Sequence, residues 1–152
     1  MDLSYDPPEQ FRTALDRAHE VVTAETGFTD FGPGDYLPGL TVLLQSMDYD
    51  PRFSETGRRY GWGQIVGVLR GRAQAIQSMK DNPGFDARPV LAPVVITGVP
   101  RTGTTALHRL MAVDPRFQGL QTWLLDSPMP RPPLDTWGDY PEFRKSAEAL
   151  AA

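Results

Sequence analysis

The sequence predicts an α/β protein built on a parallel sheet, and three observations support this. Apolar residues recur at three- and four-residue steps over much of residues 1–92, as on the buried faces of helices. A short run of β-branched residues, Val94–Thr97, is typical of a strand covered on both sides. The loop Gly98–Gly103 joins this run to a helical pattern. We therefore expect a helical region, 1–92, followed by the start of a parallel-sheet domain, 93–152.

The composition narrows the class of protein. The 152 residues suffice for a real core, and 40% apolar and 22% charged residues are ordinary for a soluble protein. A net charge of −4 argues against a general binder of nucleic acid or anionic membranes. The chain has no cysteine, and His19 and His108 lie far apart, so the sequence offers no metal or disulfide pattern. The N-terminus lacks the features of a signal peptide, and no apolar run is long enough for a transmembrane segment. We expect a cytoplasmic protein.

The first two helices are predicted from caps and periodicity. Asp6 precedes two prolines and is typical of an N-cap, so a helix of roughly 16 residues is expected from there to Gly27. A turn-rich segment, Phe28–Pro38, follows, and its aromatic residues are interpreted as helix-packing side chains. A second, shorter helix ends near Asp50-Pro51; its apolar residues are Leu40, Leu43, Leu44 and Met47.

A third helix is predicted to start at Ser54, whose hydroxyl can cap it. Several glycines in this stretch weaken a helix by about 1 kcal/mol each relative to alanine, so breaks are expected. A linker over Asp81–Pro93 then leads to the sheet unit. The residues predicted along one side of this helix are Ile65, Val68, Leu69, Arg72, Ala73, Ile76 and Met79.

The sheet unit begins with the strand Val94–Thr97 and continues with a helix over Thr104–Val113 that Asp114-Pro115 ends. Gly119–Leu125 is predicted as a second short strand. Four prolines make Pro128–Pro133 irregular, and a last helix starts near Pro141 and still runs at Ala152. The side chains expected to face the sheet from the first of these helices are Leu107, Leu110 and Met111.

The loop between strand and helix has the composition of a phosphate cradle. Loop amides and the positive end of a helix dipole attract anions. Gly98 and Gly103 have the spacing of G-x-x-x-x-G-K-[ST], but Thr104 stands in place of the lysine, and the positive charge lies in the loop at Arg101. The missing lysine argues against a kinase or NTPase that uses Mg²⁺. A tight turn without a ligand, a P-loop kinase or NTPase, and a non-catalytic helical interaction fragment remain as alternatives.

The residues Gly98-Val99-Pro100-Arg101-Thr102-Gly103-Thr104-Thr105 resemble the 5′-phosphosulfate-binding loop of sulfotransferases, which use 3′-phosphoadenosine 5′-phosphosulfate (PAPS). The stretches around the loop are similar to a bacterial, especially actinobacterial, branch of that family, so the resemblance covers most of the chain. These stretches are Thr26–Gly32, Leu107–Met111, Asp114–Phe117, Thr122-Trp123 and Pro128–Pro133.

The resemblance implies the P-loop-like parallel-sheet fold of sulfotransferases, PAPS as sulfuryl donor, no metal, and a small-molecule hydroxyl acceptor. Arg101 takes the place of the basic residue that contacts the phosphosulfate bridge. This role fits the chemistry, because negative charge grows on the bridging oxygen during sulfuryl transfer. The residues implied to bind the donor are Arg101, Thr102, Gly103, Thr104 and Thr105.

The general base is not given by the resemblance. Members of that branch often carry a glutamate just after the tryptophan, but Trp123 is followed by Leu124. Asp126 is a candidate substitute, although a solvated turn carboxylate is the competing interpretation. His108, one turn into the helix, is a second candidate for a base or an acceptor contact. Trp123 itself is either a wall of an acceptor pocket or a core aromatic residue.

The family holds the 3′-phosphate of the donor with an arginine and a serine from a later strand and helix, and this sequence contains no counterpart. One or two parallel strands also leave both edges of a sheet open. We therefore expect the chain to be the N-terminal part of a longer enzyme, with an incomplete domain from residue 93. We expect it to be inactive alone and able to self-associate through the exposed sheet edge.

Overall fold

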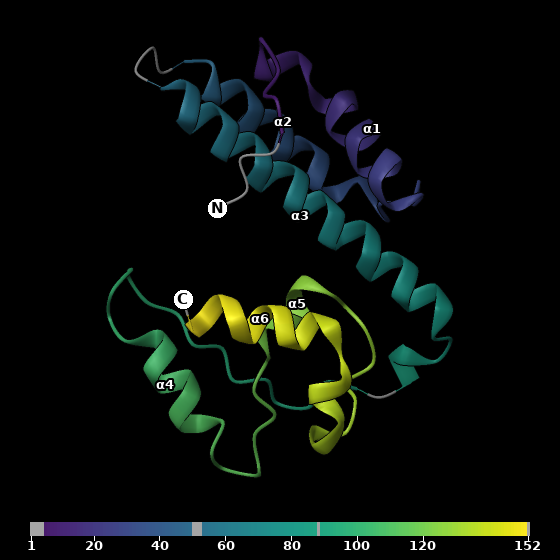
Figure 1. The fold of residues 1–152 in the computed structure, drawn as a ribbon, viewed down its shortest axis with the longest axis vertical. Helices are drawn as coiled ribbons and strands as arrows, with labels where there is room; N and C mark the ends of the chain where they lie inside the picture. Colours follow the sequence, from purple (N-terminus) through teal and green to yellow (C-terminus); the bar gives the residue numbers. More distant parts are fainter. Residues whose placement is uncertain (1–4, 50–52, 88, 152) are drawn as a thin grey trace. The chain divides into compact units, whose positions relative to one another are not determined.

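The computed structural model describes residues 5–49, 53–87 and 89–151, without the side chains of residues 150 and 151. The chain forms two compact units, Met1–Asp81 and Asn82–Ala152. Figure 1 shows the helices of each unit. All regular elements of the described residues are helical, so the part of the fold class that required a sheet is not seen in them.

Unit 1 begins with a short 3-10 helix, η1 (Phe11–Thr13), followed by α1 (Leu15–Thr26). The predicted N-cap at Asp6 is wrong. The carboxylate of Asp48 instead accepts the backbone N–H groups of Phe11 at 3.1 Å and Arg12 at 2.9 Å. Partial burial opposes the charge of Asp48, but these two hydrogen bonds and nearby arginines outweigh it and lower the pKa of Asp48. The predicted end of α1 at Gly27 is confirmed, because this residue adopts φ +74° and its N–H donates a hydrogen bond to the carbonyl of Thr23.

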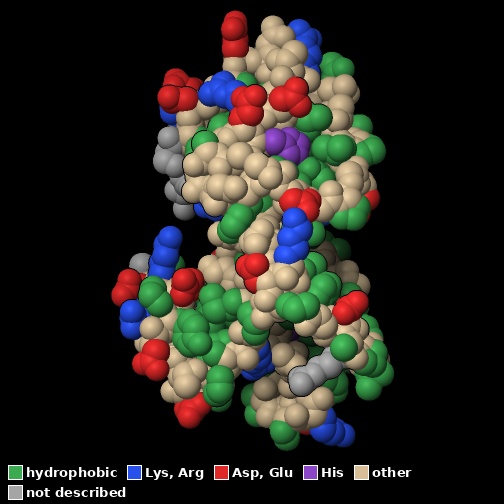
Figure 2. Space-filling view, turned by 90° about the vertical axis from the view of Figure 1, so that its right-hand side faces the viewer, with side chains coloured by type: hydrophobic (Ala, Val, Ile, Leu, Met, Phe, Trp, Pro, Cys, Tyr) green, Lys and Arg blue, Asp and Glu red, His purple; other side chains and the backbone are tan. Residues whose placement is uncertain are grey.

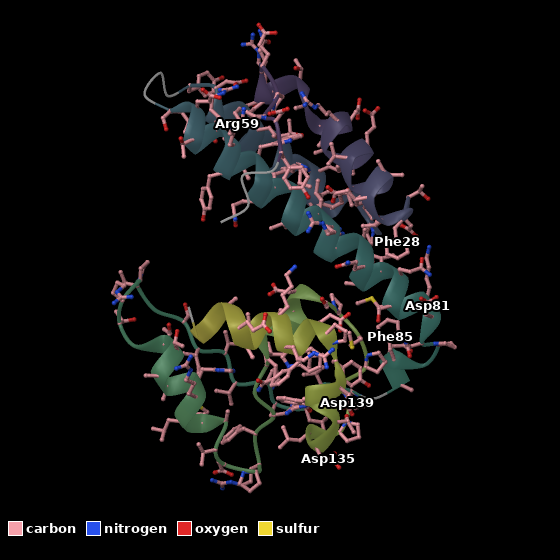
Figure 3. All side chains as sticks on the ribbon, in the orientation of Figure 1. Phe28, Arg59, Asp81, Phe85, Asp135 and Asp139 are labelled. Atoms are coloured by element: carbon pink, nitrogen blue, oxygen red, sulfur yellow. The ribbon has the colours of Figure 1, made fainter. Side chains whose placement is uncertain are left out.

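The segment between α1 and α2 (Leu37–Met47) contains the 3-10 helix η2 (Gly34–Tyr36) and is held against the later half of α3 (Glu55–Asp81). The guanidinium of Arg72 donates from Nε to the carbonyl of Phe31 at 2.6 Å and from Nη2 to Asp35 at 2.8 Å. Figure 3 shows Phe28 beside this half of α3, whereas Arg59 lies near its start. The interpretation of the aromatic residues as packing side chains is confirmed, since Phe31 belongs to the buried core and Phe28 and Tyr36 pack against it.

The second helix ends at Met47, and the Asp50-Pro51 stop that the sequence predicted lies outside the described residues. The predicted cap of the third helix is confirmed, because the Ser54 hydroxyl accepts the N–H of Gly57 at 3.1 Å. Its predicted inward stripe is only partly right, since Val68 is 72% exposed. The buried residues of α3 pack with those of α1 and α2 in one core, whose fully enclosed members are Phe11, Ala18, Val22, Trp62, Val66 and Ala73.

The predicted breaks in the third helix do not occur, as α3 runs over 27 residues. Close packing of neighbouring side chains explains the presence of two glycines in α3. A Cβ at Gly57 would lie 2.8 Å from Cε2 of Phe53, and one at Gly61 would lie 2.5 Å from Cε of Met47. Packing of neighbouring side chains against bare backbone therefore offsets the low helix propensity of glycine.

The two kinds of glycine in α3 are expected to respond oppositely to alanine. At Gly67 a Cβ would meet no atom within 4 Å, so Gly67→Ala should raise the free energy of unfolding by about 0.5–1 kcal/mol. Gly57→Ala should lower it, because the new methyl group would lie 2.8 Å from Cε2 of the Phe53 ring, which has no flexible end that could move aside. Urea unfolding of both variants checks the prediction; equal changes of the same sign would contradict it.

Unit 2 contains η3 (Phe85–Ala87), α4 (Thr104–Met111), α5 (Thr122–Asp126), the 3-10 helix η4 (Leu134–Asp139) and α6 (Pro141–Ala151). Its centre is an aromatic cluster of Trp123, Trp137, Tyr140 and Phe143, with ring centroids 5.5–5.9 Å from that of Trp123. Figure 3 marks Asp135 and Asp139 on η4, the segment that brings Trp137 into this cluster. The irregular Pro128–Pro133 and the helix start at Pro141 are confirmed.

Both predicted strands are absent from the described residues. Val94–Thr97 forms no strand with other described residues, and Val95 is 80% exposed. A strand is defined by hydrogen bonds to a neighbour, and none of the described residues offers that neighbour. Gly119–Leu125 was predicted wrongly, because α5 occupies its second half and turns Trp123 into the aromatic cluster.

The predicted inward face of α4 is not covered within the described part of unit 2. Leu107 is 47% exposed and Leu110 is 71% exposed. Figure 2 shows many hydrophobic side chains on the surface of unit 2, which is the lower part of the view. The expected self-association depended on a sheet edge that the described residues do not form, and it stays a prediction.

Candidate functional site

The candidate site is the loop Gly98–Gly103 and the start of α4. The hydroxyl of Thr102 donates a hydrogen bond to the carbonyl of Val99 at 2.7 Å, which closes a tight turn. Gly98 lies directly beneath this turn. A Cβ there would lie 2.7 Å from Oγ1 of Thr102 and 3.2 Å from Cγ2 of Thr104. The loop therefore requires glycine at position 98, for a reason of close packing rather than of φ.

Two residues of the loop adopt left-handed backbone conformations. Gly103, the N-cap of α4, has φ +91°, which suits glycine. Arg101 has φ +72°, which for a residue with a side chain costs about 1–3 kcal/mol. Strain of this kind is often found at ligand-binding loops.

The first turn of α4 presents free backbone donors. Gly103 has no side chain to cap the helix, and no side chain of the described residues accepts a hydrogen bond at this end. The N–H groups of Thr104, Thr105 and Ala106 are thus available, together with the positive end of the helix dipole. The hydroxyls of Thr104 and Thr105 accompany them, and Thr105 is exposed. This arrangement attracts an anion.

The charges near the loop differ in their availability. Arg101 is exposed and has no ion pair or side-chain hydrogen bond within the described parts of the chain. Arg109 is likewise exposed and has no such partner among the described residues. Arg116 instead pairs with Asp114 at 2.6 Å, and this hydrogen bond lowers the pKa of Asp114 and raises that of Arg116. Arg101 is therefore the cation of the loop itself that can meet an anion without breaking an existing pair.

The two candidate bases have different surroundings. His108 is partly buried on α4, and its ring lies beside the backbone of Gly119. Asp126 ends α5 with an exposed side chain, and no hydrogen bond or ion pair joins it to the loop or to His108 in the described structure. Both roles stay predictions.

Trp123 lies in the core, with 3% of its surface exposed. Sequence reasoning missed Trp137, which neighbours Trp123, and Arg131, which neighbours Trp137. Trp137 packs edge-on against Trp123, and Arg131 lies over the Trp137 ring at 5.3 Å. The spacing of tryptophans in this part of the sequence was the signal that could have indicated an aromatic core.

The described residues hold neither a candidate metal centre nor a membrane-spanning helix. They contain no group of three or more His, Asp or Glu side chains placed to hold a metal ion. Their helices include none with the length and apolar character needed to cross a bilayer. The cytoplasmic location remains a prediction from composition.

Known proteins provide an independent comparison. Residues 93–151 match a family described as the sulfotransferase family. No curated protein matches the chain. Among solved structures, the crystal structure of sulfotransferase STF1 from Mycobacterium tuberculosis is similar, with 33% sequence identity and a TM-score of 0.85. The similarity covers 94% of this chain and 40% of that protein. The helical N-terminal unit thus resembles part of that sulfotransferase fold as much as the loop does, and both comparisons support the predicted membership of the sulfotransferase family.

Proposed function

We propose that this chain forms the donor-binding part of a sulfotransferase that transfers a sulfuryl group from PAPS to the hydroxyl of a small-molecule acceptor. The observation that carries the proposal is the loop Gly98–Gly103, which places an exposed arginine beside the open N-terminus of α4. The match of residues 93–151 to the sulfotransferase family supports it.

The residues present fit the phosphosulfate group of the donor. Free N–H groups at Thr104–Ala106 and the hydroxyls of Thr104 and Thr105 can donate to the 5′-phosphate. Thr102 already donates its hydroxyl hydrogen to Val99, so its role is to hold the turn closed. Gly103 lets the backbone approach the anion without a side chain in the way.

Arg101 has the central electrostatic role in this proposal. The donor supplies an activated sulfuryl group, and the bridging oxygen gains negative charge as the sulfuryl group leaves. A guanidinium placed beside that oxygen stabilises the developing charge more than the ground state. No metal ion is required for this role, because the arginine provides the positive charge.

Nucleotide titration tests the proposal against the kinase alternative. The chain should bind adenosine 3′,5′-bisphosphate, the product left after transfer, with the same dissociation constant in EDTA and in Mg²⁺, because arginine and amides neutralise the phosphates. Calorimetry with that nucleotide and with ATP·Mg²⁺ measures the difference. Preference for ATP and a requirement for Mg²⁺ would favour a P-loop kinase or NTPase.

Transfer by this chain alone is not expected. No imidazole or carboxylate of the described residues forms a hydrogen bond or ion pair with the loop, and the chain spans 40% of the length of the similar sulfotransferase. An acceptor hydroxyl without a positioned base reacts slowly. Incubation with PAPS and a panel of simple phenols and alcohols should release adenosine 3′,5′-bisphosphate at the background rate. Turnover above background would show that the described residues hold a base that we have not recognised.

A further inference from the structure

We propose that Gly119 is a positioning residue for the donor loop: the absence of a side chain at this position lets the segment after α4 pack against that helix and fix it on the aromatic cluster of unit 2. This inference rests on the proposed function, because it assigns Gly119 to the same donor site. Gly119 lies 16 residues after Gly103 in the chain and outside the loop itself.

The contact between Gly119 and α4 is tight. A Cβ at Gly119 would lie 2.9 Å from the Cβ of Ala112, a distance that real structures essentially never show. It would also lie 3.5 Å from both Cε1 and Nε2 of His108. His108 and Ala112 are four residues apart, so they occupy one face of the helix, and the bare backbone of Gly119 lies against that face.

Gly119 is tied in turn to the aromatic cluster. Its carbonyl accepts hydrogen bonds from Nη1 of Arg131 at 3.4 Å and from Nε2 of Gln121 at 3.5 Å. The Arg131 guanidinium lies 5.3 Å from the centroid of the Trp137 ring, which is 8% exposed. A continuous series of contacts therefore leads from α4 through Gly119 and Arg131 to the buried centre of the unit.

The opposite face of α4 offers no comparable support within the described part of the chain. Leu107 and Leu110 lie there, and both are exposed. The face of His108 and Ala112 is thus the one that the segment after α4 contacts closely. Because the free N–H groups of the donor site lie at the start of this helix, a displacement of the Gly119 contact moves the phosphate cradle as well.

The test uses a substitution and its steric compensation. Gly119→Ala adds the methyl group that collides with Ala112, and Ala112→Gly in the same chain removes the group it collides with. Gly138→Ala is the matched control, because a Cβ at Gly138 meets no atom within 4 Å in the same unit. Two quantities are measured for each variant: amide hydrogen exchange of residues 103–113, and the dissociation constant of adenosine 3′,5′-bisphosphate.

Gly119→Ala should speed exchange in α4 and weaken nucleotide binding by roughly tenfold, the effect typical of an overpacked contact. The double variant should recover both quantities, and Gly138→Ala should change neither. Recovery in the double variant is informative because Ala112→Gly removes the steric clash but does not by itself add stability. Unchanged exchange in Gly119→Ala, or no recovery in the double variant, would overturn the positioning role while leaving the proposed function intact. Failure of the unaltered chain to bind the nucleotide would overturn the proposed function itself, even if exchange responds as expected.

Discussion

Replacing Arg101 by alanine should weaken the binding of adenosine 3′,5′-bisphosphate by about 1.5–3 kcal/mol, or roughly 10- to 150-fold. This range is typical of a hydrogen bond to a charged group. Arg101 is exposed and free of internal partners in the described structure, so its removal costs no existing interaction. Alanine also keeps a side chain at φ +72°, and the backbone strain of the loop is therefore similar in both proteins. Calorimetry measures the change.

The matched control for this prediction is Arg116→Ala. Arg116 is also an exposed arginine of the same unit, but it is paired with Asp114 at 2.6 Å. Its removal should leave the dissociation constant nearly unchanged, since its charge is already balanced. Equal losses in both variants would mean that binding depends on overall positive charge and not on the loop.

Replacing Trp62 by alanine should lower the free energy of unfolding of unit 1 by about 3–5 kcal/mol, the usual cost of removing a large buried aromatic side chain. Trp62 is fully buried on α3, and its ring packs against Phe11 with centroids 6.2 Å apart. The guanidinium of Arg17 on α1 lies 5.8 Å from its ring. One side chain thus joins three segments of the unit. Since small domains are stable by only about 5–15 kcal/mol, the variant should be largely unfolded in mild denaturant.

Tyr49→Ala is the control for the tryptophan substitution, because Tyr49 is 82% exposed. Its effect on urea unfolding should lie within about 0.5 kcal/mol. A change at Trp62 as small as that at Tyr49 would contradict the description of the core.

Local signals in the sequence predicted the helices well where the cause is local. Gly27 ends α1 through its left-handed backbone, and Ser54 caps α3 through its own hydroxyl. The 3-10 turn η1 before α1 was missed because the carboxylate that accepts its N–H groups comes from Asp48, more than 30 residues later in the chain. The continuity of α3 was missed for a similar reason, since the side chains of Phe53 and Met47 pack closely against two of its glycines, a tertiary contact.

The strand predictions failed because the pattern of apolar residues does not report whether a neighbouring strand is available for pairing. A β-branched run such as Val94–Thr97 becomes a strand only when a neighbour pairs with its backbone. Gly119–Leu125 contains an apolar run as compatible with a helix as with a strand. The contact of Trp123 with Trp137 accompanies the helical form in the structure.

The residue types of the candidate site could be predicted from the sequence, but their arrangement in space could not. The order of glycine, arginine and threonines in Gly98–Thr105 indicated an anion-binding loop. The sequence did not indicate that Arg101 would adopt a left-handed conformation or that Thr102 would close over Gly98. It also gave no sign of Gly119, because a single glycine in a loop is too common to be informative.

The most direct test of the donor-loop assignment is a nuclear magnetic resonance titration of the isotope-labelled chain with adenosine 3′,5′-bisphosphate. The account predicts that the largest amide shifts occur at Gly103, Thr104, Thr105 and Ala106, where free N–H groups meet the 5′-phosphate. The amide of Arg101 should shift with them. Saturable shifts that are confined to other residues, with the loop amides unmoved, would contradict the assignment of this loop as the phosphosulfate site.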